Sequence, residues 1–146
     1  MAEMEVKVTH RDPGVSIVTL AGRITAGDAL TEFRNRIRDE VAKGHNKILI
    51  DLKEVSYVDS SGLGELVLAL GTVTQTICAS CGSTLFKDDQ GQWEKCHQCN
   101  STSRKSWGQL KLANPGRQVT DLLHFTKLNT VFDVHETQAD AIASFS

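Results

Sequence analysis

Strand-type and helix-type residue patterns alternate along most of this 146-residue chain, and this alternation restricts the fold more than any other feature. Short runs rich in Val, Ile, Leu and Thr predict strands over residues 5–12, 15–24, 47–52, 108–113 and 131–134. Apolar residues spaced three and four apart predict helices over residues 25–43, 60–74, 119–126 and 137–145. Parallel neighbouring strands need crossover connections, so the alternation predicts an α/β fold with a mixed, mostly parallel β-sheet and helices packed on it.

Local signals predict where these elements begin and end. Asp12-Pro13-Gly14 is typical of a tight turn, so the first two strands should form an antiparallel hairpin. The spacing of Thr25 and Asp28 is typical of a helix start, and Gly44 should end the same helix. The residues between 53 and 59 lack a strand pattern and are predicted to form a loop.

The charge balance and hydropathy argue against two classes of partner. Lys and Arg number 16 against 18 Asp and Glu, for a net charge of −2, whereas a nucleic-acid binder is usually basic. No apolar run approaches the roughly 20 residues that a membrane helix requires. The first five residues, Met-Ala-Glu-Met-Glu, lack the basic and apolar parts of a signal peptide. We therefore expect a cytoplasmic protein without a membrane or nucleic-acid partner.

Four cysteines form two closely spaced pairs, Cys78-x-x-Cys81 and Cys96-x-x-Cys99, separated by fourteen residues. In the reducing cytoplasm this arrangement indicates a metal site and not two disulfides. Each CxxC turn can direct two thiolates at one ion, and two such turns complete a tetrahedron. The spacing predicts a structural zinc site with these four ligands, and iron in a rubredoxin-like site is the alternative metal.

The cysteines lie in a segment that interrupts the alternation, which we call the four-cysteine segment (residues 77–107). It contains no amphipathic period and is too small to fold without a metal. We predict a zinc-ribbon-like insertion between the second helix and the fourth strand, with a hairpin over residues 83–95. It divides the main domain into residues 1–76 and 108–146.

The function of the four-cysteine segment stays open at this point. Its formal charge of +1 becomes −1 once four thiolates and one Zn²⁺ are counted, which argues against nucleic-acid binding. A structural ornament, a docking element for an unknown partner and a thiol-based redox switch are the remaining alternatives.

A cluster of hydroxyl and carboxyl groups marks the start of the second predicted helix. Asp59, Ser60 and Ser61 are each possible N-caps, because their side chains can accept hydrogen bonds from unpaired backbone N–H groups. A phosphorylated serine would also be stable there, since a helix N-terminus favours an anion. Four acids and one lysine between residues 51 and 65 give a local net charge of −3, so a phosphate should alter this surface strongly. No His or nucleotide-binding loop lies nearby in sequence, and an enzyme is not expected.

The predicted hairpin, the strand at 47–52 and the segment Tyr57-Val-Asp-Ser-Ser-Gly-Leu-Gly64 resemble the STAS domain of bacterial anti-sigma factor antagonists. The resemblance continues in Gly108-Gln-Leu-Lys-Leu-Ala-Asn114, in Asp121-Leu-Leu and in Lys127-Leu-Asn-Thr-Val-Phe132. The four-cysteine segment falls outside it.

This resemblance implies a protein-binding module without enzymatic activity. It implies that the unphosphorylated domain captures an anti-sigma factor with serine-kinase activity and so releases a sigma factor. Phosphorylation of Ser60 would break that complex, and a phosphatase would restore it. The implied partner-binding residues are Asp59, Ser60, Ser61, Gly62 and Leu63. The alternatives are a STAS scaffold in another sensory or transport assembly and a zinc-thiolate redox sensor.

Overall fold

The computed structural model describes residues 5–12 and 14–145. Within these residues, the strands β1 (Glu5–Arg11), β2 (Val15–Ile24), β3 (Lys47–Val58), β6 (Gln109–Ala113) and β7 (Asp133–His135) form one sheet in the order β1-β2-β3-β6-β7. The β1–β2 pair is antiparallel, and the β2–β3, β3–β6 and β6–β7 pairs are parallel. The predicted mixed, mostly parallel sheet is therefore confirmed. Pro13 of the predicted hairpin turn lies outside the described residues.

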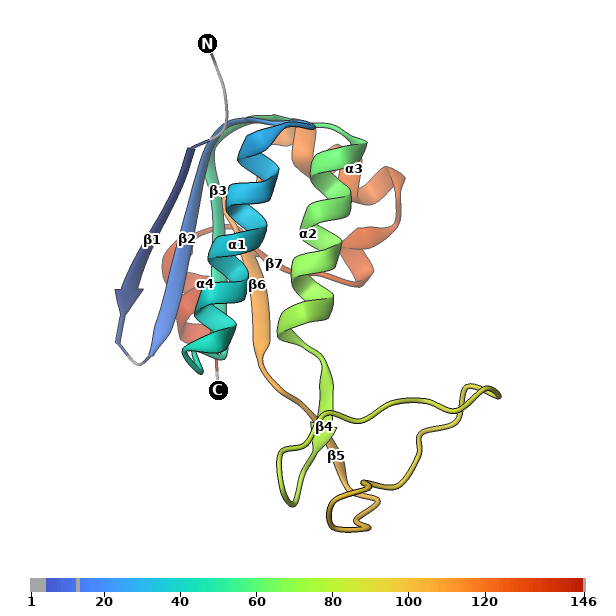
Figure 1. Cartoon of the computed structure of the whole chain (residues 1–146). Helices are drawn as coiled ribbons and strands as arrows, with labels where there is room; N and C mark the ends of the chain where they lie inside the picture. Colours follow the sequence, from blue (N-terminus) through green and yellow to red (C-terminus); the bar gives the residue numbers. More distant parts are fainter. Residues whose placement is uncertain (1–4, 13, 146) are drawn as a thin grey trace.

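Helices cover both faces of the sheet (Figure 1). The helices α1 (Asp28–Ala42), α2 (Ser60–Val73) and α3 (Arg117–Phe125) pack on the main core, whose side chains include Ile48, Ile50 and Leu52. Helix α4 (Gln138–Ser144) packs on the opposite face against Leu49. Successive side chains of a strand point to opposite faces, so the continuous apolar run in β3 serves both cores.

Two boundaries differ from the sequence-based expectations. Helix α1 begins at Asp28 and not near Thr25, because Gly27 is the N-cap and adopts a φ of +147° that other residues rarely adopt. The predicted loop after Leu52 is wrong, because β3 continues to Val58 beside β2. Two register shifts place extra residues in β3, so its buried Val55 and Val58 lie three apart and hide the strand period.

The last strand and the ribbon hairpin also differ in detail. A 3₁₀ turn, η1 (Leu128–Thr130), precedes β7, which begins two residues later than predicted. The predicted hairpin within the four-cysteine segment is reduced to one bridge between Lys87 and Trp93. Its turn is built around Asp88, whose side chain accepts from the amides of Gln90 and Gln92 at 2.9 Å.

The four-cysteine segment projects away from the sheet at the far end of α2 (Figure 1). It leaves through β4 (Thr76–Cys78) and returns through β5 (Arg104–Ser106), which pair antiparallel. The Trp107 amide donates to the Gln75 carbonyl at 2.8 Å, so the chain enters and leaves at one point. Buried Cys78, Leu85 and Cys96 form a small apolar cluster of their own there.

Candidate functional site

The exposed hydroxyl of Ser60 stands at the first residue of α2, directly after β3. Asp59 has an extended backbone and is the N-cap; its carboxylate accepts from the Gly62 amide at 2.9 Å. Its carbonyl accepts from the Leu63 amide, also at 2.9 Å. Of the three possible caps, Asp59 is therefore the one used, and the side chains of Ser60 and Ser61 face solvent.

A close backbone approach fixes this helix start against the end of β2. The Asp59 amide donates to the Ile24 carbonyl at 3.2 Å. Gly62 lies against the same residue, where an added Cβ would overlap the Ile24 carbonyl oxygen and come within 2.7 Å of its Cγ2. Only glycine fits here without displacing the helix. Gly62 and Leu63 are buried, so they position this turn and do not form its surface.

Gln118 of α3 supplies a contact that sequence reasoning missed. Its Nε2 donates to the Val58 carbonyl and its Oε1 accepts from the Val58 amide, both at 2.9 Å. The β3–β6 pairing ends at Asp51 and Ala113, so β6 does not reach Val58, and Gln118 bonds both backbone groups of Val58 instead. Val58 and Gln118 are 60 residues apart in the sequence, so no local pattern predicts their contact.

The expected acidic surface around Ser60 is not formed. Asp51 is buried on the α4 side, where Asn114 and Gln138 donate to its carboxylate at 3.0 and 2.8 Å. Glu65 is also buried and forms an ion pair with Arg34 of α1. The local net charge of −3 for residues 51–65 therefore does not describe the surface around Ser60, because it counts carboxylates that point in different directions.

An exposed apolar stripe runs along α2 from Ser60. Gly64, Val67, Leu68 and Gly71 lie on one side of the helix and are exposed, with Val67 at 38% and Leu68 at 58%. The spacing of four, three, one and three residues from Ser60 places them on one face. Val67 and Leu68 therefore leave apolar surface in solvent on the face of α2 that also carries Ser60.

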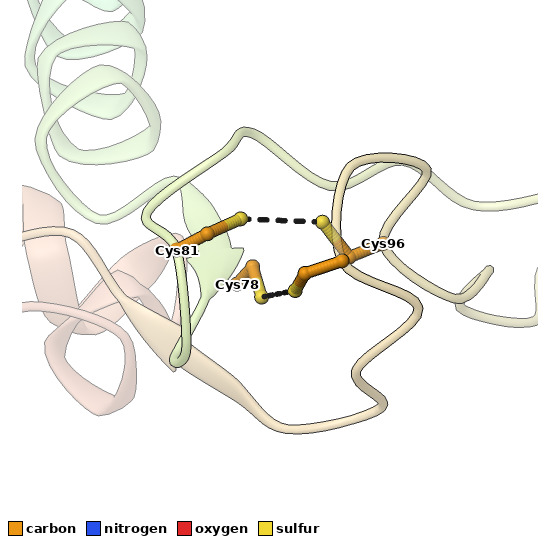
Figure 2. Close-up of side chains that lie close together, drawn as sticks. Cys78, Cys81 and Cys96 are labelled. Carbon is orange, nitrogen blue, oxygen red and sulfur yellow. Dashed lines mark hydrogen bonds between the residues drawn. The ribbon is translucent and has the colours of Figure 1, made fainter.

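The four cysteines converge on one point. Their sulfur atoms all lie within 4.8 Å of one another. The Sγ–Sγ distance is 3.6 Å between Cys78 and Cys99 and 3.4 Å between Cys81 and Cys96. Figure 2 shows the labelled side chains of Cys81 and Cys96 pointing toward each other. A disulfide needs about 2.05 Å, whereas thiolates at 2.3 Å from a tetrahedral metal lie about 3.8 Å apart. The site therefore has the composition and nearly the dimensions of a four-thiolate metal site.

The two CxxC turns repeat one backbone pattern. The Cys78 amide donates to the Ser83 carbonyl at 2.8 Å, and the Cys96 amide donates to the Ser101 carbonyl at 3.0 Å. Each turn then places a left-handed residue directly after its second cysteine: Gly82 with φ +83° and Asn100 with φ +61°. Glycine and asparagine are the residues that adopt this left-handed backbone most readily.

Hydrogen bonds and the closeness of the four sulfur atoms give the thiols different pKa values. The backbone amide of Cys81 is the main cause that lowers the pKa of Cys78 to about 6. The hydroxyl of Ser83 lowers the pKa of Cys81. The amide of Ser101 favours the thiolate of Cys99, but its cysteine neighbours outweigh this and raise the pKa to about 12. A divalent cation would relieve that crowding of negative charge.

The family model of the STAS domain matches residues 6–76, which include the hairpin, β3, the capped turn and α2. This match and the α/β fold identify a STAS domain in the chain. The match ends before the first cysteine. No curated protein sequence matches the chain.

The solved structures that share this fold include anti-sigma factor antagonists. The one from Mycobacterium paratuberculosis is 19% identical, covers 99% of this chain and 95% of its own, and gives a TM-score of 0.68. A putative anti-sigma factor antagonist from Thermotoga maritima is 21% identical, with 96% and 93% covered and a TM-score of 0.64. The Bacillus cell fate determinant SpoIIAA in its phosphorylated form is 16% identical, with 95% and 97% covered and a TM-score of 0.58. At these identities the likeness is one of fold.

None of the helices in the described part of the chain combines the length and hydropathy that a membrane crossing requires.

Proposed function

We propose that this protein is an anti-sigma factor antagonist whose partner binding is switched by phosphorylation of Ser60. The unphosphorylated protein captures an anti-sigma factor of the serine-kinase fold in the cytoplasm and so releases a sigma factor. The partner phosphorylates Ser60 and is released, and a phosphatase restores the binding form. The protein itself is not an enzyme in this proposal.

The single observation that carries the proposal is the placement of Ser60. Its side chain is exposed on a backbone fixed by the Asp59 cap, by Ile24 and by Gln118. A phosphate at this position would lie at the positive end of the α2 dipole, so it can be carried without loss of the fold. The Asp59 carboxylate accepts from the Gly62 amide, which favours a structural role for Asp59 over a role as a base.

The proposed partner surface consists of Ser60, Ser61 and the apolar stripe that follows them on α2. Val67 and Leu68 would be its apolar centre, and a phosphate at its edge would need desolvation when the partner docks. A charge buried without a partner in an interface costs several kcal/mol. Phosphorylation would therefore weaken binding without unfolding the domain.

The experiment compares Ser60→Asp and Ser60→Ala with the wild-type protein. Each is titrated calorimetrically against purified anti-sigma factors of the serine-kinase fold from the source organism. We expect Ser60→Asp to weaken binding by at least about tenfold, which corresponds to about 1.4 kcal/mol. Ser60→Ala should bind like the wild type and should not be phosphorylated when kinase and ATP are added. Equal binding by Ser60→Asp and wild type, or phosphate found on Ser61 by mass spectrometry, would refute the proposal.

We also propose that Cys78, Cys81, Cys96 and Cys99 hold one structural Zn²⁺. The support is the convergence of the four sulfurs and the repeated backbone pattern of the two turns. In elemental analysis of protein purified without chelator, Cys96→Ser should contain one zinc per chain fewer than the wild type, while its main sheet stays folded. Iron in place of zinc, or disulfides in place of thiols, would contradict this assignment.

A zinc-thiolate redox sensor is the second candidate function. Cys81 and Cys99 are exposed residues, which favours this candidate because oxidation follows thiol exposure. Reversible zinc release under mild oxidant, together with altered partner binding, would favour the sensor. Zinc release without any change in binding would leave the segment a structural or docking element. A STAS scaffold in another assembly would bind its partner regardless of the charge at position 60.

A further inference from the structure

A second group of metal-ligating side chains lies at the edge of the sheet formed by β1, beside the end of α1. It consists of His10 in β1, Glu40 near the end of α1, and His45 in the loop before β3. Glu40 Oε1 lies 2.9 Å from His10 Nε2 and 3.0 Å from His45 Nδ1. The two imidazole centroids are 5.0 Å apart with an interplanar angle of 67°. Two ring nitrogens therefore lie within hydrogen-bond distance of the same carboxylate oxygen.

The end of α1 is shaped so that Glu40 and His45 meet. The His45 amide donates to the Glu40 carbonyl and the Gly44 amide donates to the Val41 carbonyl, both at 3.0 Å. Gly44 has a φ of +83°, and the whole arrangement is a Schellman motif. In such motifs the two residues in the places of Glu40 and His45 usually make an apolar contact. Here they make a carboxylate–imidazole pair, and β1 adds a second imidazole from across the sheet edge.

Burial differs sharply within the group. The Glu40 side chain is 4% exposed, whereas those of His10 and His45 are 54% and 38% exposed. The carboxylate is therefore held in place from within the protein. The imidazoles are open to solvent, so an ion can reach the group and a water can complete its coordination.

We propose that His10, Glu40 and His45 form a second metal site that binds Zn²⁺ with two imidazoles, one carboxylate and a water. Two His and one Glu form a known zinc donor set, and neutral imidazole suits zinc well. Ligand atoms at 2.0–2.1 Å from a tetrahedral ion lie about 3.3 Å apart. The two observed N–O distances are slightly shorter, so a small outward movement of the exposed rings admits the ion. Each ring then carries its proton on the nitrogen that faces away from the metal.

Bound zinc would join the edge strand β1 to helix α1. A ligand that binds only the folded state raises the stability of that state, so zinc should raise the melting temperature beyond the effect of the cysteine site.

The test is zinc binding by the full chain, measured by equilibrium dialysis and elemental analysis. We expect two zinc ions per wild-type chain, and one in His10→Gln and in His45→Gln. The matched control His124→Gln replaces an exposed histidine of α3 and should retain two. Cys96→Ser should lose the other ion, so the failure of one site is distinguishable from the failure of the other.

Cobalt substitution provides an independent reading, because thiolate ligands give intense charge-transfer absorption and imidazole or carboxylate ligands do not. After the cysteine site is filled, a second equivalent of Co²⁺ should add only weak visible bands in the wild type and none in His45→Gln. Circular dichroism confirms that each variant is folded. One zinc per chain in both wild type and His45→Gln, or equal loss in His124→Gln, would overturn the proposal and leave the group a hydrogen-bonded clasp.

Discussion

Replacement of Gly62 by alanine tests whether the fold requires the close approach of Gly62 to the Ile24 backbone. Alanine normally stabilises a helix, so a loss of stability would show that the approach matters more. The new Cβ would overlap the Ile24 carbonyl oxygen and lie 3.0 Å from its carbonyl carbon. A backbone carbonyl cannot move aside by changing a rotamer, so either β2 or the start of α2 must shift. Overpacking of this kind costs about 1–3 kcal/mol, and weakening the Asp59–Ile24 hydrogen bond costs about 1 kcal/mol more. The helix-propensity gain of alanine returns about 1 kcal/mol, so we expect a net loss of about 2 kcal/mol.

Gly64→Ala is the matched control, since it lies two residues further along the same helix and its added Cβ would meet nothing within 4 Å. It should stabilise the protein by about 0.5–1 kcal/mol. Urea unfolding of the two variants should therefore differ by about 3 kcal/mol, and their melting temperatures by about 10 °C. The reasoning is refuted if Gly62→Ala is as stable as Gly64→Ala, because the turn that carries Ser60 would then not depend on this approach.

Three further predictions concern parts of the fold away from Ser60. Burial alone would raise the pKa of Glu40, but hydrogen bonds from Ser16, His45 and His10 outweigh it and lower the pKa from 4.5 to about 2. Because the pKa is lower in the folded state, the Glu40 carboxylate stabilises the fold above pH 4.5, and this stabilisation is lost as the pH falls toward 2. In metal-free buffer, Glu40→Gln should remove up to about 3 kcal/mol of this pH-dependent stability. The curve of unfolding free energy against pH should then be flatter than that of the wild type. Lys127 has a φ of +63°, so Lys127→Gly should stabilise by about 0.5–1 kcal/mol in chemical denaturation, and a destabilised glycine variant would contradict the left-handed backbone. Deletion of residues 76–107, with a short Gly-containing turn in their place, should leave a cooperatively unfolding domain because the two main cores include none of these residues. An insoluble product would show that the cores depend on them.

The sequence allowed the sheet class, the helices and the four-cysteine cluster to be predicted, because each has a local signal. Apolar residues at helical spacing identify α2, and two CxxC turns identify the four cysteines that converge. The second half of β3 could not be predicted in this way. Its register depends on pairing with β2, and the extra residues near Glu54 and Tyr57 disturb the alternation that reveals a strand.

The sequence predicted the place of Ser60 at a helix start, but not the residues that hold this helix start in place. The cap could be narrowed to three residues, but its supports, Ile24 and Gln118, come from distant parts of the chain. The same limit hid the group around Glu40, because His10 lies 30 residues before it. Summing charge along the sequence failed for a related reason, since burial and ion pairing are decided by tertiary packing.

The adjacent strands β4 and β5 bear on the speed and cooperativity of folding. Lys47 of β3 pairs with Gln109 of β6, and the chain between them must close a loop before this pairing forms. Because the four-cysteine segment begins and ends at one point, a folded segment removes about half of that chain from the loop. Loop closure costs only about 0.6 kcal/mol for each doubling of length. A chain whose four-cysteine segment is unfolded should therefore assemble its central parallel pair almost as readily, although with a longer flexible connection exposed to proteases.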